Sequence, residues 1–191
     1  MAVKDYNCTL HHNVLTEQIM EKYHGLLPRV YCEAASMLNL AQDIAEANQS
    51  PFLMFPLDYI TEAEAMGYPV KGYDDNFGPR AGAPNLKTIS ELSRLKKIDF
   101  SSGRINEVLQ AIALAKAKNR LSCLNLSGFF TVITIFLPFS TVCSAWRKQK
   151  DGVIKFWQRF SDDLLTYVTL AQKAGARIFS YDDSTAAASI I

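Results

Sequence analysis

Three short apolar segments, separated by long stretches with helical patterns, constrain the fold of this chain most. The segments cover residues 52–57, 121–126 and 176–181, and each is expected to form a strand. The apolar run at 51–57 is short enough to be a buried one. An alternation of strands and helices is typical of parallel strands that are joined by crossover helices. A length of 191 residues is typical of one domain. The sequence therefore predicts a single α/β domain over residues 1–191 with a parallel sheet.

The stretches around these strands predict the remaining elements. Helices are expected at 14–24, 29–47, 58–66, 88–97, 104–118, 140–148 and 151–174, with residues 1–27 as an N-terminal extension or first helix. A weak strand is expected at 68–73 and a loop at 74–84, while 129–136 fits either a helix or a strand. Thr88 and Glu91 have the spacing of a capping box. The buried stripe of the longest helix is expected to contain Ile154, Trp157, Phe160, Leu164, Tyr167, Val168 and Ala171.

Polar or small residues follow each predicted strand. Asp58 follows the first strand, Ser127 and Gly128 follow the second, and Asp183 and Ser184 follow the third. In a (β/α) barrel, the active site is built at this carboxyl end of the strands. The three strand ends therefore favour one shared site, and they favour part of a (β/α)8 TIM barrel as the architecture.

Asp58 has two interpretations. A carboxylate at the end of a buried strand is costly to desolvate, so it needs a partner, a proton or a ligand. Alternatively, Asp58 simply caps the helix that follows it. Two further carboxylates, Glu62 and Glu64, come next in the sequence, so this segment concentrates acidic groups whichever interpretation holds.

Two other sets of residues are weaker candidates for ligand binding. Arg80 lies in a loop rich in Gly, Pro, Asp and Asn, where its planar fork can bind an anion or simply face solvent. Cys8, His11 and His12 are close enough in sequence to suggest a metal site. They lie in a polar N-terminal segment without a second ligand pair, so a chance grouping is favoured for them.

Charge and hydropathy argue against several classes of protein. The formal net charge of +1 argues against non-specific nucleic-acid binding, which needs a basic surface. The most apolar window, Leu121–Trp146, is interrupted by polar residues and a proline, so core is favoured over a membrane span. Residues 1–16 lack a signal-peptide pattern. Four cysteines without CxxC spacing are then expected to be reduced thiols in a cytoplasmic protein.

Three segments resemble the uroporphyrinogen decarboxylase superfamily, which includes heme-pathway decarboxylases of porphyrin synthesis and corrinoid-dependent methyltransferases that act on coenzyme M. The segments read FPLDYITEAEAMG at 55–67, SGFFTVIT at 127–134 and AGARIFSYDDSTA at 174–186. The resemblance covers about residues 28–191, and EAEAMG is its most specific part. It implies the N-terminal half of a uroporphyrinogen decarboxylase-type barrel.

The resemblance also implies roles for residues. Asp58 matches the catalytic aspartate of the decarboxylases, which interacts with the pyrrole N–H groups and stabilises a cationic intermediate. Ser184 matches a serine that contacts a substrate carboxylate, and Asp183 occupies the acidic position before it. The expected site residues are catalytic Asp58 and substrate-binding Glu62, Glu64, Arg80, Ser127, Gly128, Asp183 and Ser184.

Departures from the decarboxylase pattern favour the methyltransferase branch. The arginine-rich N-terminal segment of the decarboxylases has no counterpart, and Ile135 stands near the position of a tyrosine. EAEAMG resembles the methyltransferases, in which zinc held by His and Cys activates a thiol as thiolate and a methylcorrinoid is the methyl donor. Those zinc ligands lie in the second half of the barrel, so no metal ligand is expected within this chain.

A (β/α) barrel typically needs about 250 residues, so an apparently truncated barrel is expected. Its expected partners are a small-molecule or tetrapyrrole substrate, a corrinoid protein, and either a complementing half-barrel chain or a second copy, with no nucleic acid or membrane. Methyl transfer from a methylcorrinoid to a thiol is the favoured function. A porphyrin-pathway decarboxylase and a non-catalytic remnant that binds a corrinoid or tetrapyrrole remain alternatives.

Overall fold

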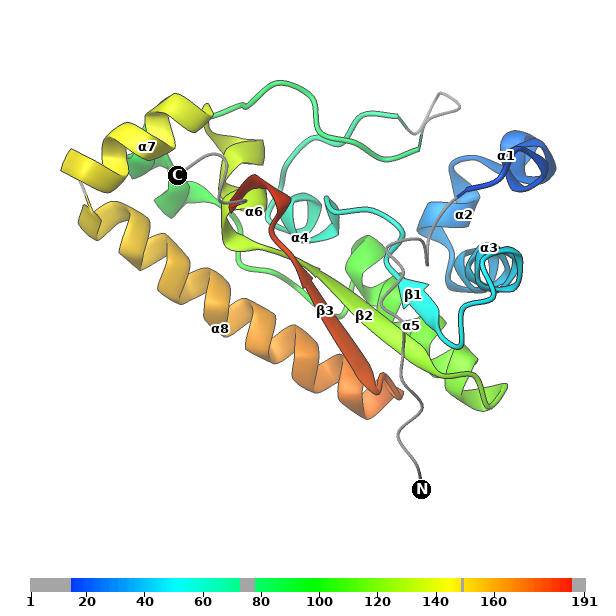
Figure 1. The fold of residues 1–191 in the computed structure, drawn as a ribbon. Coiled ribbons are helices and arrows are strands. Elements are labelled where there is room, and N and C mark those ends of the chain that lie inside the picture. Colours follow the sequence, from blue (N-terminus) through cyan, green and yellow to red (C-terminus); the bar gives the residue numbers. More distant parts are fainter. Residues whose placement is uncertain (1–14, 73–77, 149, 187–191) are drawn as a thin grey trace.

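The computed structural model describes residues 15–72, 78–148 and 150–186, and it contains a three-stranded parallel sheet (Figure 1). The strands are β1 (Leu53–Phe55), β2 (Ser122–Ser127) and β3 (Ile178–Asp182), in the order β1-β2-β3. Phe55 is in register with Leu124, which is in register with Phe179. The predicted α/β fold with a parallel sheet is therefore confirmed.

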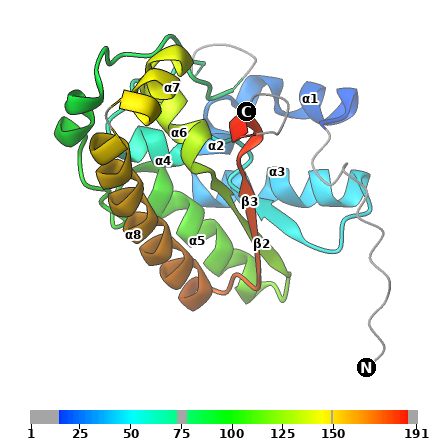
Figure 2. The same cartoon turned by 60° about the vertical axis from the view of Figure 1, so that its left-hand side comes forward.

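Helices connect these strands and cover them. The α-helices are α1 (Glu17–Tyr23), α2 (Arg29–Cys32), α3 (Ala34–Ala47), α4 (Thr61–Ala65), α5 (Gly103–Ala117), α6 (Phe129–Phe136), α7 (Phe139–Lys148) and α8 (Lys150–Ala174). The 3-10 helices are η1 (His24–Leu26), η2 (Ile89–Arg94) and η3 (Ser184–Ala186). Helix α5 packs between α3 and α8 and contacts β1 and β2 (Figure 2). The long helices thus follow the order of the strands, while α4 and α6 begin at the carboxyl ends of β1 and β2.

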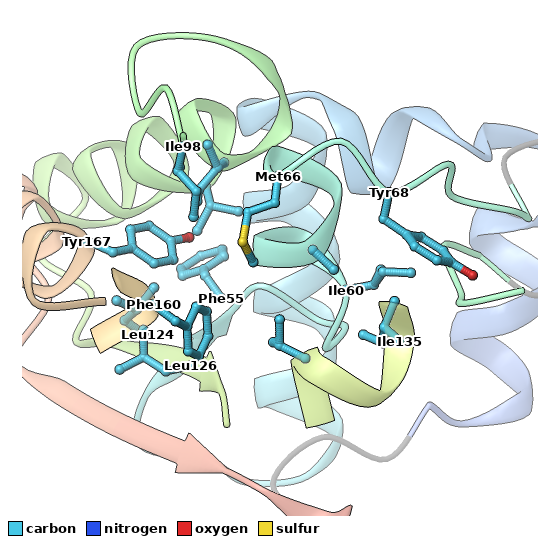
Figure 3. Packing of buried hydrophobic residues seen from close by; sticks show 14 of the residues in the cluster. Phe55, Ile60, Met66, Tyr68, Ile98, Leu124, Leu126, Ile135, Phe160 and Tyr167 are labelled. Atoms are coloured by element: carbon cyan, nitrogen blue, oxygen red, sulfur yellow. The ribbon is translucent and has the colours of Figure 1, made fainter. Parts of the chain in front are cut away.

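The main hydrophobic core lies between the sheet and these helices. Figure 3 shows Phe55 and Leu124 of the sheet meeting Phe160 and Tyr167 of α8. Phe160 also stacks on Phe156, with ring centroids 6.1 Å apart. Fully burying one large apolar side chain stabilises a fold by roughly 1.5–3 kcal/mol, so this core fixes the helices against the sheet.

The predicted single helix over 29–47 is wrong, because the helix is interrupted at Glu33. This residue has an extended backbone, with φ −119° and ψ 127°. The Glu33 carboxylate pairs with Arg29 at 2.8 Å. The backbone N–H of Ala34, at the start of α3, donates to the Glu107 carboxylate on α5 at 2.8 Å. The Glu107 carboxylate thus caps the N-terminus of α3 and allows a new helix to begin at Ala34. Sequence periodicity does not reveal such a contact with a distant helix.

The segment between α4 and α5 contains less regular structure than predicted. In place of a strand at 68–73, the described residues show an isolated bridge between Lys71 and Arg80. Gly72 has a φ of +91°, and a Cβ there would lie 1.9 Å from the carbonyl oxygen of Gly78. Over its described residues, the predicted strand thus pairs only at the Lys71–Arg80 bridge, and Tyr73 lies outside the described residues.

The helix predicted at 88–97 is the shorter 3-10 helix η2. It ends where Leu95 takes an extended backbone. The Glu91 carboxylate accepts a hydrogen bond from the Thr88 backbone N–H at 2.8 Å. The capping box read from the sequence therefore marks the correct start of this element.

The buried stripe of α8 differs from the prediction at its N-terminal end. Val153 and Phe156 are buried there, whereas Ile154 and Trp157 are 36% and 48% exposed. A Cβ at Gly152 would lie 2.4 Å from Ile89 of η2. This close approach turns Val153 and Phe156 inward, so the predicted stripe is wrong by one position in the first two turns and right from Phe160 onward.

In the part of the chain that the structure describes, no single helix has both the length and the apolar composition to span a membrane. Helices α6 and α7 reach that threshold only as a pair, and they are bent by 110° at their junction.

Candidate functional site

The carboxyl ends of β1 and β2 meet in a buried set of polar side chains, hereafter the inner cluster. It comprises Asp58, Glu62, Glu64, Arg104 and Ser127, from the β1–α4 segment, α5 and the end of β2. The inner cluster therefore unites four of the predicted site residues with an arginine that the strand-end pattern did not include.

Arg104 forms ion pairs with two carboxylates. Its Nη1 pairs with Asp58 Oδ2, and its Nε donates to Glu64 Oε2 at 2.6 Å. The side chains of Arg104 and Asp58 are only 4% and 7% exposed, and that of Glu64 is 27% exposed. Because buried charges are stable only when paired, Arg104 is the partner that the buried strand end required.

Asp58 also makes two local hydrogen bonds in the turn before α4, whose N-cap residue is Ile60. Its Oδ1 accepts from the Ile60 backbone N–H at 3.0 Å and from the Thr61 hydroxyl at 3.2 Å. Both carboxylate oxygens of Asp58 are thus engaged, one with α4 and one with Arg104. This carboxylate links the β1–α4 turn to α5. The interpretation of Asp58 as the cap of α4 is wrong, because Ile60 is the N-cap residue of that helix, whereas the partner that a buried carboxylate needs is supplied by Arg104.

Glu62 and Ser127 form the most buried contact of the inner cluster. Glu62 Oε1 accepts from the Ser127 backbone N–H at 3.0 Å, and Oε2 lies 2.8 Å from the Ser127 hydroxyl. Burial raises the pKa of Glu62, an effect that the hydrogen bonds from Ser127 oppose and the neighbouring Asp58 carboxylate reinforces. Glu62 is therefore tied to the end of β2 and does not face solvent.

A second polar group, hereafter the outer cluster, forms between the end of β3 and the start of α6. Asp183 Oδ1 accepts from the Thr131 backbone N–H at 2.8 Å and from its hydroxyl at 3.0 Å, and Oδ2 accepts from the Phe130 N–H at 3.1 Å. The Tyr181 hydroxyl oxygen accepts from the Phe129 N–H at 2.9 Å. The first N–H groups of α6, which have no partner within the helix, are thus satisfied from β3.

Gly128 allows the Asp183 side chain to lie close to the start of α6. A Cβ at Gly128 would lie 2.2 Å from the Cβ of Asp183, a distance that packed atoms do not reach. Ser127 and Gly128 are adjacent in sequence, but Ser127 belongs to the inner cluster and Gly128 to the outer one. The predicted single site at the strand ends therefore consists of two neighbouring groups.

The two remaining predicted residues, Ser184 and Arg80, are not members of the inner or the outer cluster as defined above. Ser184 is exposed at the start of η3. Arg80 is partly buried in its own turn, with Nη1 3.5 Å from the Gly78 carbonyl oxygen. Arg80 is therefore not a fully solvated loop arginine, and these contacts do not place it in either cluster.

Sequence reasoning missed Arg104 and gave Tyr167 only a core role. Arg104 lies on the same stripe of α5 as Val108, Ile112 and Ala115, and a cation in an apolar stripe signals a buried carboxylate partner. Burial raises the pKa of Tyr167 far above its usual value, and the carboxylates of Glu62 and Asp58 raise it further. Tyr167 therefore faces the inner cluster as a neutral phenol.

The described residues do not fit a zinc site of the kind that the methyltransferase branch implies. Over 15–72, 78–148 and 150–186, no three His, Cys, Asp or Glu side chains are grouped so that they could hold a metal ion. In the same ranges, Cys32, Cys123 and Cys143 are thiols that form no disulfide. The candidate Cys8, His11 and His12 lie outside the described residues.

Comparisons with known proteins agree with one another. The family model described as uroporphyrinogen decarboxylase (URO-D) matches residues 9–190. Methylcobamide:CoM methyltransferase MtbA of Methanosarcina mazei is 25% identical over 103 residues, which cover 54% of this chain and 30% of that protein. A solved methyltransferase from Methanosarcina mazei aligns with a TM-score of 0.72 and 20% identity, over 87% of this chain and 50% of that one. The chain thus covers half of the solved relative and less of the curated one.

Proposed function

Because the chain belongs to the uroporphyrinogen decarboxylase (URO-D) family, whose model matches residues 9–190, we propose that it forms part of a methyl-transfer enzyme. The proposed reaction moves a methyl group from a methylcorrinoid to a thiol acceptor. The similarity to a methylcobamide:CoM methyltransferase is the observation that carries this choice within the family. The EAEAMG segment at 62–67, which contributes Glu62 and Glu64 to the inner cluster, supports it.

The chain's own contribution is a rigid polar frame at the carboxyl ends of the strands. In the proposed branch, a zinc ion activates the thiol, but the described residues offer no ligand group for zinc. Arg104 holds Asp58 and Glu64, and Asp183 holds the start of α6. A surface cavity of about 340 Å³ is lined by Cys32, Glu64, Gly103, Arg104 and Glu107. The substrate is proposed to contact the protein at this cavity.

The full reaction is proposed to need further polypeptide. This chain covers 50% of the solved methyltransferase and 30% of the curated one. Strand β3 pairs with β2 on one side, and its Phe179 and Tyr181 are 39% and 56% exposed. A complementing half-barrel, from another chain or a second copy, is proposed to pair with β3, and a corrinoid protein is the proposed source of the methyl group.

A methyl-transfer assay tests the proposal. The chain is mixed with methylcobalamin and coenzyme M, with and without zinc and with and without a protein that supplies the second half of a family barrel. We expect coenzyme M methylation to require the complementing protein. Asp58→Asn keeps a side-chain oxygen for α4 but loses the charge that pairs with Arg104. It is expected to lower the rate at least about tenfold, because a hydrogen bond to a charged group contributes about 1.5–3 kcal/mol. No methylation in any mixture would overturn the proposal.

The family model keeps decarboxylation as a second candidate, because its description is uroporphyrinogen decarboxylase. The Asp58 side chain, which the resemblance matches to the decarboxylase aspartate, is 7% exposed and paired with Arg104. Decarboxylation therefore requires this carboxylate to become accessible to substrate. Porphyrinogen turnover that is lost in Asp58→Asn would favour this candidate, whereas tetrapyrrole binding without product would favour a non-catalytic role.

A further inference from the structure

The hydroxyl of Ser127 lies between two oxygen atoms that both usually accept hydrogen bonds. Its Oγ is 2.9 Å from the carbonyl oxygen of Tyr59 and 2.8 Å from Oε2 of Glu62. A serine hydroxyl carries one proton, so it can donate to only one of these oxygens. In the other oxygen–oxygen contact, a group other than Ser127 must supply the hydrogen-bonding proton.

Only one of the two oxygens can carry that proton. The Tyr59 carbonyl has none, and an ionised Glu62 would only accept hydrogen bonds. With Glu62 ionised, one of the two oxygen–oxygen contacts would be a buried repulsion between lone pairs. With Glu62 protonated, Oε2–H donates to Ser127 Oγ, whose own proton goes to Tyr59, while the Ser127 N–H donates to Oε1. Each of the three contacts then has one donor and one acceptor.

The charges around Glu62 agree with this assignment. Asp58, in the segment after β1, carries a like charge that raises the pKa of Glu62. Arg104 on α5 already pairs with Asp58 and with Glu64 of α4, so its single charge does not balance a third carboxylate. Tyr167 on α8 faces the same region as a neutral phenol. Glu62 itself is 0% exposed, so water does not stabilise its ionised form.

We propose that Glu62 is a neutral carboxylic acid in the folded protein and that it acts as a positioning residue. Its proton links the end of β2, through Ser127, to the backbone of Tyr59, which directly follows Asp58. The protonation is independent of the proposed function. The positioning role rests on that function, because it assigns a use to the turn that carries Asp58.

Glutamine is the matched substitution for this assignment. Its amide would present an N–H where the neutral acid of Glu62 presents its O–H, and a carbonyl oxygen where the acid accepts from the Ser127 N–H. Glu62→Gln is therefore expected to keep the network. Glu62→Ala removes it, and Ser127→Ala leaves the Glu62 proton without its acceptor.

Infrared spectroscopy of the whole chain tests the protonation directly. At neutral pH we expect the difference spectrum of wild type minus Glu62→Gln to contain a carbonyl band of a protonated carboxylic acid. Ser127→Ala is expected to shift this band to higher frequency, because the acid loses its hydrogen-bond acceptor. A carboxylate band in place of the acid band would overturn the proposal. If Glu62→Gln does not fold, pH titration of the wild-type acid band decides the same question.

Unfolding as a function of pH tests the linkage. A carboxyl whose pKa is raised in the folded state releases its proton on unfolding once the pH exceeds its usual pKa of 4.5. The stabilisation is therefore complete below that pH and is lost as the pH rises through the folded pKa. Above 4.5, the unfolding constant of wild type relative to Glu62→Gln should rise by about tenfold per pH unit. Parallel curves for the two proteins would overturn the proposal.

Activity then separates positioning from protonation. Glu62→Ala should transfer methyl groups at least about tenfold more slowly than Glu62→Gln when both are folded, because misplaced catalytic groups cost rate. Equal rates for Glu62→Ala and wild type would overturn the positioning role and leave the infrared result intact. If wild type shows the acid band but no methyl transfer in any mixture, the proposed function fails while the protonation of Glu62 stands.

Discussion

The inner and outer clusters both hold carboxylates at the carboxyl edge of the sheet, but they stabilise them by different means. In the inner cluster, Asp58 and Glu64 both form ion pairs with the side chain of Arg104. In the outer cluster, Asp183 is held by backbone N–H groups of α6 and by one hydroxyl. One cluster depends on a paired charge, and the other depends on a close approach of backbones.

This difference separates two neighbours in the sequence. Ser127 contacts Glu62, whereas Gly128 lies against Asp183. A loss of charge balance should therefore affect the inner cluster most, and a gain of steric bulk should affect the outer cluster most. Point substitutions can test this difference, because a different residue is expected to be sensitive to substitution in each cluster.

Removal of the Arg104 guanidinium is expected to have the largest effect. Arg104→Met keeps an unbranched side chain on α5 but leaves Asp58 with an uncompensated buried charge. Breaking a buried pair in this way costs about 3–5 kcal/mol, so the free energy of unfolding in urea should fall by that amount. Arg29→Met, which removes an exposed pair with Glu33, should cost far less, because solvent screens that pair. Similar losses for both variants would show that Arg104 does not anchor the inner cluster.

Gly128→Ala is the corresponding test of the outer cluster. The added methyl would lie 2.2 Å from the Cβ of Asp183, and overpacking of this kind typically costs about 1–3 kcal/mol. Gly25→Ala is the matched control, since a Cβ there meets nothing within 4 Å, and it should change stability by about 0.5 kcal/mol or less. Thermal unfolding of both variants measures the difference. A Gly128→Ala protein as stable as the control would contradict the close approach.

Asp183→Ala should have a smaller effect, because water can reach this half-buried position. The variant loses a carboxylate that caps the first turn of α6, and such caps contribute about 0.5–2 kcal/mol. Asp183→Asn retains one side-chain oxygen and should lose less. Urea unfolding at low and high salt separates the charge from the hydrogen bonds. An equal loss in both variants at both salt concentrations would show that the charge makes no contribution.

The sequence predicted the parts of the fold that depend on local pattern. Residues 52–57, 121–126 and 176–181 each contain most of a strand of the parallel sheet, and the capping box at Thr88 marks the start of η2. The predictions that failed depend on distant contacts. The break at Glu33 needs Glu107 of α5, and the shifted stripe of α8 needs Ile89 of η2.

The site shows the same division. The polar strand ends were readable because Asp58 and Ser127 directly follow predicted strands and Asp183 follows the third after one intervening residue. Their grouping into two clusters was not readable, because it depends on which side each residue faces and on Arg104, 46 positions after Asp58. A charged residue inside the apolar stripe of a predicted helix is the signal that would have revealed Arg104.

Tyr167→Phe is expected to have the smallest effect on the inner cluster. Among the described residues, the Tyr167 hydroxyl has no hydrogen-bond partner, although the ring is fully buried. Removal of an unsatisfied buried hydroxyl should leave stability unchanged or raise it by up to about 1 kcal/mol. Tyr23→Phe is the matched control, because the Tyr23 hydroxyl donates to Asp43 at 2.6 Å. Its loss should cost about 0.5–1.5 kcal/mol. If Tyr167→Phe were the more destabilising of the two in urea, the Tyr167 hydroxyl would be a member of the inner cluster and not merely its neighbour.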